Sequence, residues 1–304
     1  MVDIIIPLYN KEEFIEDTLH SVNSQLYNDY KCYIIDDGSD DNSINLVKNF
    51  IKDKPRFFLI KRNEELSKGA ATCRNIGLQN SNQKFIQFLD ADDLLAPNKI
   101  SSQLELLVDE NPLTISTCKW GGLLNGKIER YNNLISYKSF YNIPGFLNSL
   151  TQSKGYFPIH AYLIPRKLIQ KSGLWNEALA LNDDGEFIMR ILSNTTKVVY
   201  SKKGYVLYRG SNGNNLSDFS SLNKTEGALI SWILVENMLI EKFDSRVLKF
   251  IEFSKGKFFS NVERNYPNLI QENPIFFKKQ IADKKKEKSF SHRLRKKLFK
   301  LIYG

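Results

Sequence analysis

The sequence predicts an α/β protein built on a central, mainly parallel β-sheet that is flanked by helices. Short, continuous apolar runs alternate with amphipathic stretches from the first residue to about residue 118. Strands without polar alternation are typical of parallel sheets that are covered on both faces. With 304 residues, of which 42% are hydrophobic, the chain can form a core of ordinary size without a disulfide or metal to support it.

Expected strands and helices alternate along the first part of the chain. Apolar runs such as Ile4-Ile5-Ile6 predict the strands, and apolar residues at helical spacing, such as Ile15, Leu19 and Val22, predict the helices. We expect strands at residues 4–6, 32–35, 57–60, 85–89 and 114–118, and helices at residues 12–22, 43–51, 68–79 and 104–108.

The middle of the chain is less regular. Residues 123–131 predict a hairpin that turns at Asn125-Gly126. We further expect strands at 161–164 and 197–200, a short helix at 186–192, and helices after Asn215 that break near Pro267 and Pro274. The expected organisation is one domain at 1–215, with halves at 1–120 and 121–215, and a helical C-terminal region at 216–304.

Polar residues gather where three of the expected strands end. The strands are followed by Pro7-Leu8-Tyr9-Asn10, Asp36-Asp37-Gly38-Ser39 and Asp90-Ala91-Asp92-Asp93. Ligands of open parallel sheets bind beyond the carboxyl ends of the strands. The sequence therefore predicts a polar, acidic binding site at this edge of the sheet.

The two acidic clusters each have a structural and a functional interpretation. Asp36-Asp37-Gly38-Ser39 can be a turn that leads into a helix, but a carboxylate there can also accept a hydrogen bond from a uracil N–H or a ribose hydroxyl. Asp90-Ala91-Asp92-Asp93 can be a solvated loop whose last residue caps a helix. Three carboxylates in four residues repel one another unless a cation or polar ligand offsets them, and their hard oxygens suit Mg²⁺ or Mn²⁺ held together with substrate phosphates.

A third acidic cluster, Asn182-Asp183-Asp184-Gly185-Glu186, precedes an amphipathic segment. Acidic residues are common in the first turn of a helix, where they offset the positive end of its dipole. The functional interpretation is a general base at the start of a helix that points into the site.

Together these segments resemble the inverting glycosyltransferases of family 2, which have the GT-A fold. The resemblance runs from Asp3 to about Arg209, roughly two-thirds of the chain. The residues that carry it are Ile4 to Asn10, Asp36 to Ser39, Gly69 with Arg74 to Leu78, Phe88 to Asp93, Gly173 to Glu177 and Asp183 to Phe187.

The resemblance implies a role for individual residues. Pro7 and Tyr9 would line the nucleotide pocket, Asp37 would accept the uracil N–H, and Arg74 would contact the base or a phosphate. Asp90-Ala91-Asp92 looks like the family's DxD motif, with Asp90 at the ribose and Asp92 at the metal.

In the second half, Asp184 falls where the family has its catalytic base. Many members have Glu-Asp where this chain has Asp183-Asp184, which leaves open which of the two faces the acceptor. His160 and Trp175 are further candidates for the acceptor pocket, although a lone His or Trp is more often a packed core residue. Residues 1–120 would thus bind the nucleotide sugar and residues 121–215 the acceptor.

The expected function is metal-dependent inverting transfer of a hexose or N-acetylhexosamine from a nucleotide sugar, with UDP the expected nucleotide. The acceptor would be a hydroxyl of a glycan or lipid-linked oligosaccharide in surface polysaccharide synthesis. One alternative is a nucleotidyltransferase, but Pro7-Leu8-Tyr9-Asn10-Lys11 lacks the glycine-rich loop of that class. The other is a non-catalytic, membrane-associated glycan-binding relative.

Nearly all the net charge lies at the C-terminus. The chain has a formal net charge of +9, and residues 278–304 carry eleven Lys or Arg against Asp283 and Glu287. A near-neutral body argues against nucleic acid as its partner. Within this basic tail, residues 289–303 predict a basic amphipathic helix. Such a pattern is typical of an anchor, so we expect residues 278–304 to bind an anionic membrane surface. Packing on the protein itself or on a second subunit is the alternative.

Two remaining features bear on where the protein works. Cys32, Cys73 and Cys118 share no short spacing, so we expect buried, reduced thiols rather than a zinc site or a disulfide framework. The N-terminus does not resemble a signal peptide, and no apolar run approaches the ~20 residues of a membrane span. We expect a cytoplasmic protein, peripheral on the inner face of the cell membrane.

Overall fold

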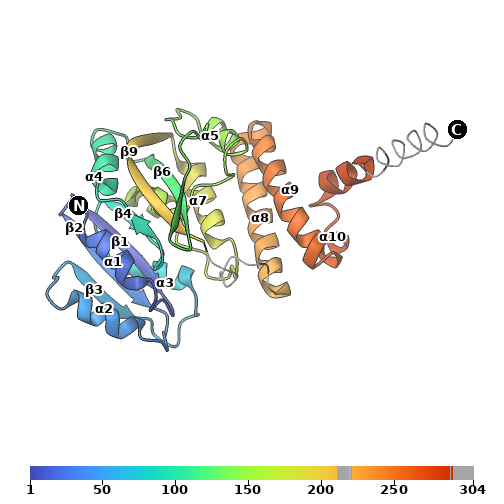
Figure 1. Ribbon diagram of the computed structural model, residues 1–304. Coiled ribbons are helices and arrows are strands. Elements are labelled where there is room, and N and C mark those ends of the chain that lie inside the picture. The colour runs from blue at the N-terminus through green and yellow to red at the C-terminus, as the bar shows by residue number, and fades with distance from the viewer. Residues whose placement is uncertain (211–218, 220, 288, 290–304) are drawn as a thin grey trace.

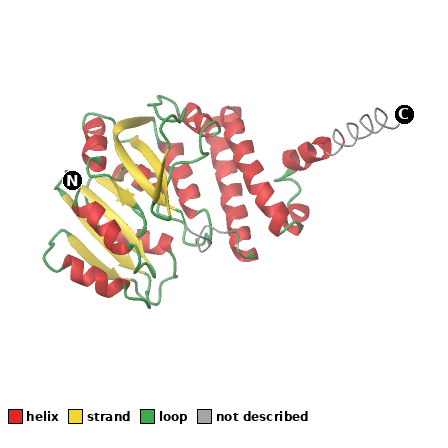
Figure 2. Ribbon diagram, viewed as in Figure 1, coloured by secondary structure: helices red, strands yellow, loops and turns green. Residues whose placement is uncertain are grey.

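The computed structural model describes residues 1–210, 219, 221–287 and 289. It has two β-sheets with helices packed around them, followed by a helical region at the C-terminal side (Figures 1 and 2). The predicted α/β class with a mainly parallel central sheet, flanking helices and a helical extension is confirmed.

The first sheet has five strands in the order β3-β2-β1-β4-β8. Its strands β1 (Val2–Leu8), β2 (Tyr30–Asp36), β3 (Phe57–Lys61) and β4 (Phe85–Phe88) are parallel, and the short β8 (Ile164–Pro165) runs antiparallel to β4. All seven residues of β1 except Pro7 are buried, as expected for a central strand covered on both faces. The order places the carboxyl ends of β1, β2 and β4 next to one another.

Helices α1 (Ile15–Asn23), α2 (Ser43–Ile51) and α3 (Ala70–Asn80) alternate with these strands. The buried residues of α1 and α2, such as Leu19 and Val47, join the same apolar core as the strands. Helix α3 lies against β1 and β2. A Cβ on Gly77 would come 2.4 Å from the side chain of Ile5, so the glycine allows α3 to pack closely on the sheet.

The second sheet has four strands in the order β5-β9-β6-β7. They are β5 (Leu94–Leu95), β6 (Thr114–Leu124), β7 (Lys127–Arg130) and β9 (Lys197–Arg209), and only β6 and β9 pair in parallel. The predicted hairpin is present, and Asn125 and Gly126 at its turn have φ of 50° and 73°, the left-handed values of a tight hairpin turn. Helix α4 (Lys99–Leu107) packs on β9 and β6.

The segment between the hairpin and β9 contains α5 (Ile143–Leu150), η1 (Ile159–Ala161), α6 (Arg166–Ser172) and α7 (Asp183–Asn194). The strand predicted at 161–164 is wrong for most of its length. Ala161 ends a short 3₁₀ helix, and the strand begins at Ile164 and has only two residues. The apolar run predicted burial correctly, since residues 159 and 161–164 are all buried, but burial alone does not distinguish a strand from a buried turn.

The C-terminal region consists of α8 (Leu222–Phe243), η2 (Asp244–Val247), α9 (Leu248–Asn265) and α10 (Asn268–Glu272), and residues 278–287 are again helical. The breaks predicted near Pro267 and Pro274 are present, whereas the break at 244–247 was not predicted. The helices enclose a second apolar cluster, which includes Phe258, Phe259 and Phe277. Most of the predicted basic amphipathic helix, residues 290–303, lies outside the described residues.

Cys32, Cys73 and Cys118 are free and buried, as predicted. Burial raises the pKa of all three thiols above the ordinary value. In the described part of the chain, every helix is too short or too polar to cross a bilayer.

Candidate active site

The site begins where β1 and β2 end. The backbone N–H of Asp37 donates to the carbonyl of Leu8 at 2.8 Å, which joins the two strand ends. Asp36 turns its carboxylate back onto the turn and accepts hydrogen bonds from the backbone N–H groups of Gly38 and Ser39, both at 3.1 Å. Asp36 therefore stabilises the turn, and Asp37 is the carboxylate left for another role.

Asp37 is paired with a cation that the sequence analysis did not single out. Arg62, just after β3, places its Nε 2.5 Å from Oδ1 of Asp37, and both side chains are largely buried. Tyr9, which is expected to line the nucleotide pocket, is 38% exposed, and Nζ of Lys68 lies 3.7 Å from the centre of its ring. The expected nucleotide pocket therefore has an exposed aromatic ring beside a buried carboxylate that Arg62 holds in place.

The three carboxylates of the loop after β4 each have a different positively charged or N–H partner. Asp90 pairs with Arg74 at 2.7 Å, and Asp92 pairs with Lys11 at 2.5 Å. Asp93 is buried, lies 3.0 Å from Nδ1 of His160, and accepts a hydrogen bond from the backbone N–H of Arg209 at 2.7 Å. These partners offset the mutual repulsion that the sequence predicts for this loop. Asp93 does not cap a helix, contrary to the structural interpretation of this cluster.

Arg74 links the two halves of the site. Its guanidinium donates to Asp90 at 2.7 Å and to Asp183 at 2.9 Å, so it connects the loop after β4 with the start of α7. The same group lies 4.3 Å from the centre of the Trp175 ring, which supports its buried face. The structure thus brings Arg74, Asp90 and Asp183 together. Arg74 was expected to contact the base or a phosphate, and in this structure its guanidinium contacts two carboxylates.

Helix α7 begins at Asp183, directly after Asn182, whose φ is 62°. Asp184 is exposed to solvent, and its Oδ1 accepts the backbone N–H of Gly185 at 2.7 Å. Desolvation, and then the negative charge of Asp183, raises the pKa of Asp184 to about 6, although the cation of Arg74 acts against the rise. A carboxylate with such a pKa is a better proton acceptor than an ordinary aspartate.

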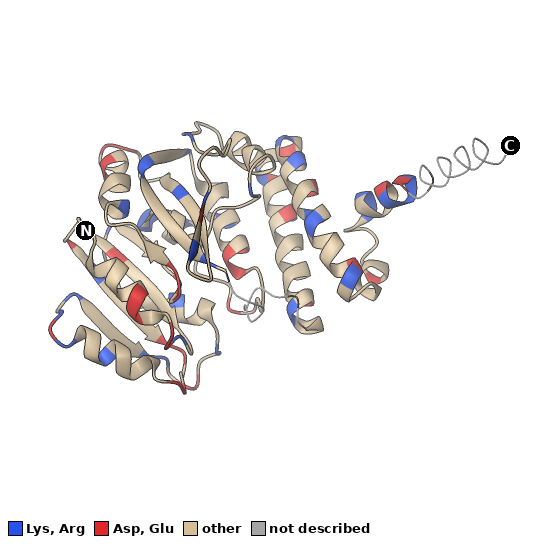
Figure 3. Ribbon diagram, in the orientation of Figure 1, with Lys and Arg blue, Asp and Glu red and all other residues tan. Residues whose placement is uncertain are grey.

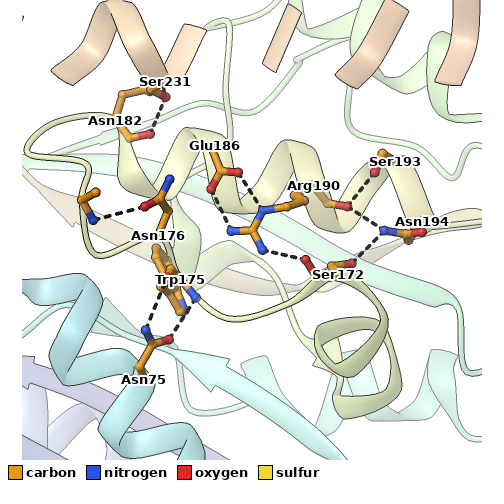
Figure 4. Close-up of polar contacts among 11 residues, drawn as sticks. Asn75, Ser172, Trp175, Asn176, Asn182, Glu186, Arg190, Ser193, Asn194 and Ser231 are labelled. Carbon is orange, nitrogen blue, oxygen red and sulfur yellow. Dashed lines mark hydrogen bonds and ion pairs between the residues drawn. The ribbon is translucent and has the colours of Figure 1, made fainter. Parts of the chain in front are cut away.

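Hydrogen bonds join the loop before α7 to α3, and the residue before α7 to α8 (Figure 4). The side chain of Asn75 in α3 donates to the carbonyl of Trp175 at 3.0 Å and accepts its N–H at 2.9 Å. Asn182 donates to the hydroxyl of Ser231 in α8 at 2.8 Å. Within α7, Arg190 forms a two-point ion pair with Glu186. These contacts fix the helix end that carries Asp183 and Asp184.

His160 and Trp175, the expected acceptor residues, lie behind the surface of the site. His160 is fully buried beside Asp93, and Trp175 is 3% exposed, stacked on Phe187 with 4.0 Å between ring centres. Both touch residues of the site, His160 through Asp93 and Trp175 through Arg74. These contacts are typical of residues that position other side chains: His160 positions the Asp93 carboxylate, and Trp175 positions the Arg74 guanidinium.

The sequence analysis missed Lys11, Arg62 and Arg209 as site residues. Lys11 directly follows the Pro7 to Asn10 segment, so its position beside the strand end could have indicated it. Arg62 follows a predicted strand, whereas Arg209 ends β9, which was predicted only as far as residue 200. A single arginine at either place carries no signal before the folding partner is known. Arg209 also donates from Nε to the carbonyl of Asp92 at 2.8 Å, and so fixes the acidic loop from the second sheet.

A family model described as glycosyl transferase family 2 matches residues 3–173. The chain belongs to this family. The match covers the first sheet, the loop after β4 and most of the segment that leads to α7. The predicted family is therefore confirmed.

Curated relatives in family 2 include proteins of surface polysaccharide synthesis. The UDP-Glc:alpha-D-GlcNAc-diphosphoundecaprenol beta-1,3-glucosyltransferase WfgD of Escherichia coli is 34% identical over 111 residues, which are 36% of this chain and 42% of WfgD. The minor teichoic acid biosynthesis protein GgaA of Bacillus subtilis is 26% identical over 269 residues, 83% of this chain and 57% of GgaA. The chain spans 15% of the length of a glycosyltransferase from Rickettsia bellii and 44% of one from Haemophilus influenzae.

Solved structures show the same fold. The S. aureus protein TarS in complex with UDP-GlcNAc superposes with a TM-score of 0.70 at 20% identity, over 91% of this chain and 78% of that one. GalNAc-T7 with UDP, GalNAc and Mn²⁺ superposes with a TM-score of 0.60 at 14% identity, over 90% of this chain and 58% of that one.

Proposed function

We propose that the protein transfers a hexose or N-acetylhexosamine from a UDP-sugar to a hydroxyl of a glycan or lipid-linked oligosaccharide, with inversion of the anomeric centre. The arrangement that carries the proposal is the set of carboxylates at the sheet edge. Arg74 joins Asp90 of the acidic loop to Asp183, which stands next to the candidate base Asp184. Family membership and the role of WfgD and GgaA in surface polysaccharide synthesis support the same reaction class.

Donor binding is assigned to the first half of the site. Asp37, oriented by Arg62, accepts the uracil N–H, while Pro7 and Tyr9 line the pocket and Asp90 contacts the ribose. Lys11, now beside Asp92, is a cation close to where a diphosphate would lie. In this arrangement the nucleotide is bound by residues of β1, β2 and the loop after β4.

A divalent cation suits Asp92. In the described residues no three His, Cys, Asp or Glu side chains are grouped to hold a metal. Mg²⁺ in phosphate-transfer sites, however, is often bound through only one or two carboxylates together with substrate phosphates. The donor set therefore fits Mg²⁺ or Mn²⁺ held by Asp92 and the diphosphate. When bound, such an ion supplies charge stabilisation to the leaving diphosphate.

Proton transfer is assigned to Asp184. The acceptor hydroxyl loses its proton as it attacks the anomeric carbon, and the carboxylate of Asp184 accepts that proton. A single displacement from the side opposite the diphosphate inverts the anomeric centre, and no enzyme nucleophile takes part. Asp183, held by Arg74, keeps Asp184 facing the acceptor side.

We also propose that the protein acts in the cytoplasm on the inner face of the cell membrane. Residues 288–304, nearly all outside the described part of the chain, contain six Lys or Arg and no Asp or Glu. Each such cation near an anionic leaflet contributes about 1 kcal/mol. The helical residues 278–287 just before them also carry lysines, among them Lys284 and Lys285 (Figure 3).

The donor is tested by thermal-shift measurements with UDP-glucose, UDP-galactose, UDP-GlcNAc, UDP-GalNAc, GDP-mannose and dTDP-glucose, and with ATP, CTP, GTP and UTP for comparison, each with and without Mn²⁺. A UDP-sugar is expected to raise Tm with increasing concentration, because ligands that bind only the folded state stabilise it by mass action. Asp37→Ala is expected to abolish the shift. A response to nucleoside triphosphates alone would instead favour a nucleotidyltransferase, and no response to any nucleotide would contradict the assignment.

A further inference from the structure

An aromatic surface extends from the acidic loop onto the second sheet. In the parallel pairing of β6 and β9, Trp120 lies opposite Val206, and Gly122 lies opposite Tyr208. Because side chains alternate along a strand, Trp120 and Tyr208 share one face of this sheet. The Tyr208 ring stacks on His160 with 6.3 Å between centres, and His160 contacts Asp93 of the acidic loop. The face that carries Trp120 therefore begins at the candidate site.

Two tyrosines cover Trp120 on this face. The ring centre of Tyr131 lies 4.7 Å from that of Trp120, and the ring centre of Tyr156 lies 5.1 Å from it. Trp120 is only 2% exposed, whereas Tyr156 is 46% exposed. Tyr156 is thus an open aromatic ring with a buried indole behind it.

The segment that carries Tyr156 is firmly attached. The next residue, Phe157, is buried and packs against Tyr137, Phe146 and Tyr162 with 5.8 to 6.0 Å between ring centres. This packing anchors the backbone on one side of Tyr156 in the core. Tyr156 is exposed although the next residue is anchored in the core. Its ring therefore suits contact with a ligand better than it suits core packing.

Tyr156 also lies within electrostatic reach of the candidate base. Desolvation, followed by the negative charge of Asp184, raises the pKa of Tyr156 to about 12. The Asp184 carboxylate therefore acts on this ring from the site. At the other end of the surface, Nζ of Lys154 lies 3.9 Å from the centre of the Tyr131 ring and 3.7 Å from Glu129, so polar groups border the aromatic rings.

We propose that Tyr156, backed by Trp120 and Tyr131, is the platform on which a sugar ring of the acceptor stacks. Sugar C–H groups carry partial positive charge and pack on the negative face of an aromatic ring, while Lys154 and Glu129 can bind hydroxyls at the edge. The acceptor nucleophile is then a hydroxyl of a saccharide, not of an alditol phosphate or a simple lipid alcohol. This inference rests on the proposed function and deepens it, because it names the residues that bind the acceptor sugar.

The test measures weak binding by saturation-transfer NMR in the presence of UDP and the diamagnetic ion Mg²⁺. The probes are methyl β-D-glucopyranoside, methyl N-acetyl-α-D-glucosaminide and ribitol 5-phosphate, titrated into the full-length protein, Tyr156→Phe, Tyr156→Leu and the control Tyr141→Leu. Tyr141 is 77% exposed and packs near Lys197, away from the platform. Tyr156→Leu should weaken glycoside binding by about five- to tenfold, because the aromatic contact is lost. Tyr156→Phe and Tyr141→Leu should stay within about twofold of the parent protein.

Selective saturation of the aromatic protons provides a readout that needs no variant. In the parent protein it should transfer to the ring C–H protons of a glycoside and not to ribitol 5-phosphate. Unchanged binding in Tyr156→Leu, equal losses in Tyr156→Phe and Tyr156→Leu, or transfer only to ribitol 5-phosphate would each overturn the platform. UDP signals in the same samples report the donor site separately: parent protein that binds no UDP contradicts the proposed function, whereas UDP binding without glycoside binding contradicts only the platform.

Discussion

At the scale of single residues, the central feature is the balance of charges around Asp184. Desolvation and Asp183 raise its pKa, and Arg74 lowers it. The base is competent only when it is deprotonated, so its pKa sets the lower pH limit of the reaction. Arg74 therefore influences catalysis even though, in this structure, it touches only Asp90, Asp183 and the Trp175 ring.

The first prediction concerns pH. Activity at saturating donor should fall as pH drops through about 6, because Asp184 gains a proton there. Arg74→Met should move this fall to higher pH, since the nearby positive charge that favours the carboxylate is removed. Arg74→Lys keeps the charge and serves as the control. Initial rates of UDP release between pH 4.5 and 8.5 measure the pH at which activity falls in each protein. Superimposable pH profiles for Arg74→Met and the parent would contradict the electrostatic role of Arg74.

Single residues also show what the sequence could reveal. The acidic clusters were predicted from their place after strands or before a helix, and the family resemblance singled out Asp37, Asp90, Asp92 and Asp184 within them. In the structure Asp37, Asp90 and Asp92 are each paired with a cation, and Asp184 follows Asp183, which Arg74 binds. Lys11 and Arg62, the partners of Asp92 and Asp37, were not predicted. A carboxylate cluster stands out along a sequence, but the cation that neutralises it can come from a distant strand.

At the scale of elements, the position of α3 determines where Arg74 lies. The helix packs against β1 through Gly77, where a Cβ would come 2.4 Å from Ile5 and 3.1 Å from Ile35. Gly77→Ala should therefore overpack this contact and lower the free energy of unfolding by about 1–3 kcal/mol. A Cβ on Gly256 in α9 would meet no other atom within 4 Å, so Gly256→Ala should stabilise the protein by about 0.5–1 kcal/mol. Urea unfolding of both variants measures the contrast, and equal effects of the same sign would contradict the packing argument.

The first residue of α4 is an unusual buried cation. Lys99 is fully buried and donates to Gln87 and to the carbonyl of Tyr162. Desolvation lowers its pKa to about 7 from the ordinary 10.5. Between these two values the unfolded chain holds the proton more tightly, so the free energy of unfolding should rise with pH in this range.

Lys99→Met should remove that contribution. Between pH 7 and 10 the free energy of unfolding of the parent should rise relative to that of Lys99→Met, by up to about 1.4 kcal/mol for each pH unit. The reason is that only a protein with Lys99 has a group at this position whose pKa is lower in the folded state. Lys52→Met changes an exposed lysine and should run parallel to the parent. Chemical unfolding at pH 7, 8, 9 and 10 gives the three curves, and a constant difference between parent and Lys99→Met would show that Lys99 keeps an ordinary pKa.

The elements themselves were largely predictable in the first half of the chain. Alternating apolar runs and amphipathic segments predicted β1 to β4 and α1 to α3, because the burial of residues in each of these elements follows a simple repeat. The separate second sheet was not predicted, since β6 has the same buried pattern as β1. Which sheet a buried strand joins depends on its pairing partner, and β9 lies more than seventy residues later in the sequence.

At the scale of the whole molecule, the described C-terminal helices pack on one another as far as residue 287. Phe277 is fully buried and Gln280 is 8% exposed, and Lys284 is paired with Glu263. Residues up to 287 therefore belong to the helical region, and a deletion that tests the basic segment should start after them.

Deletion of residues 288–304 should leave folding and donor binding unchanged but weaken membrane attachment at least tenfold. The reason is the loss of six cations, each about 1 kcal/mol near an anionic leaflet. Co-sedimentation with vesicles of phosphatidylglycerol and phosphatidylcholine measures attachment, with pure phosphatidylcholine vesicles and high salt as controls. Equal binding of the full and shortened chains would exclude the segment as the anchor.

The central claim is that Asp184 is the catalytic base of a UDP-sugar transferase, and one paired measurement on Asp184→Asn tests it most directly. Isothermal titration with UDP and the initial rate of UDP release from the identified donor, each with Mn²⁺, are compared with the parent and with the exposed control Asp53→Asn. The account predicts UDP affinity within about twofold and a rate lower by about 10²–10⁴-fold in Asp184→Asn alone. A near-normal rate in that variant, with UDP affinity unchanged, would contradict it.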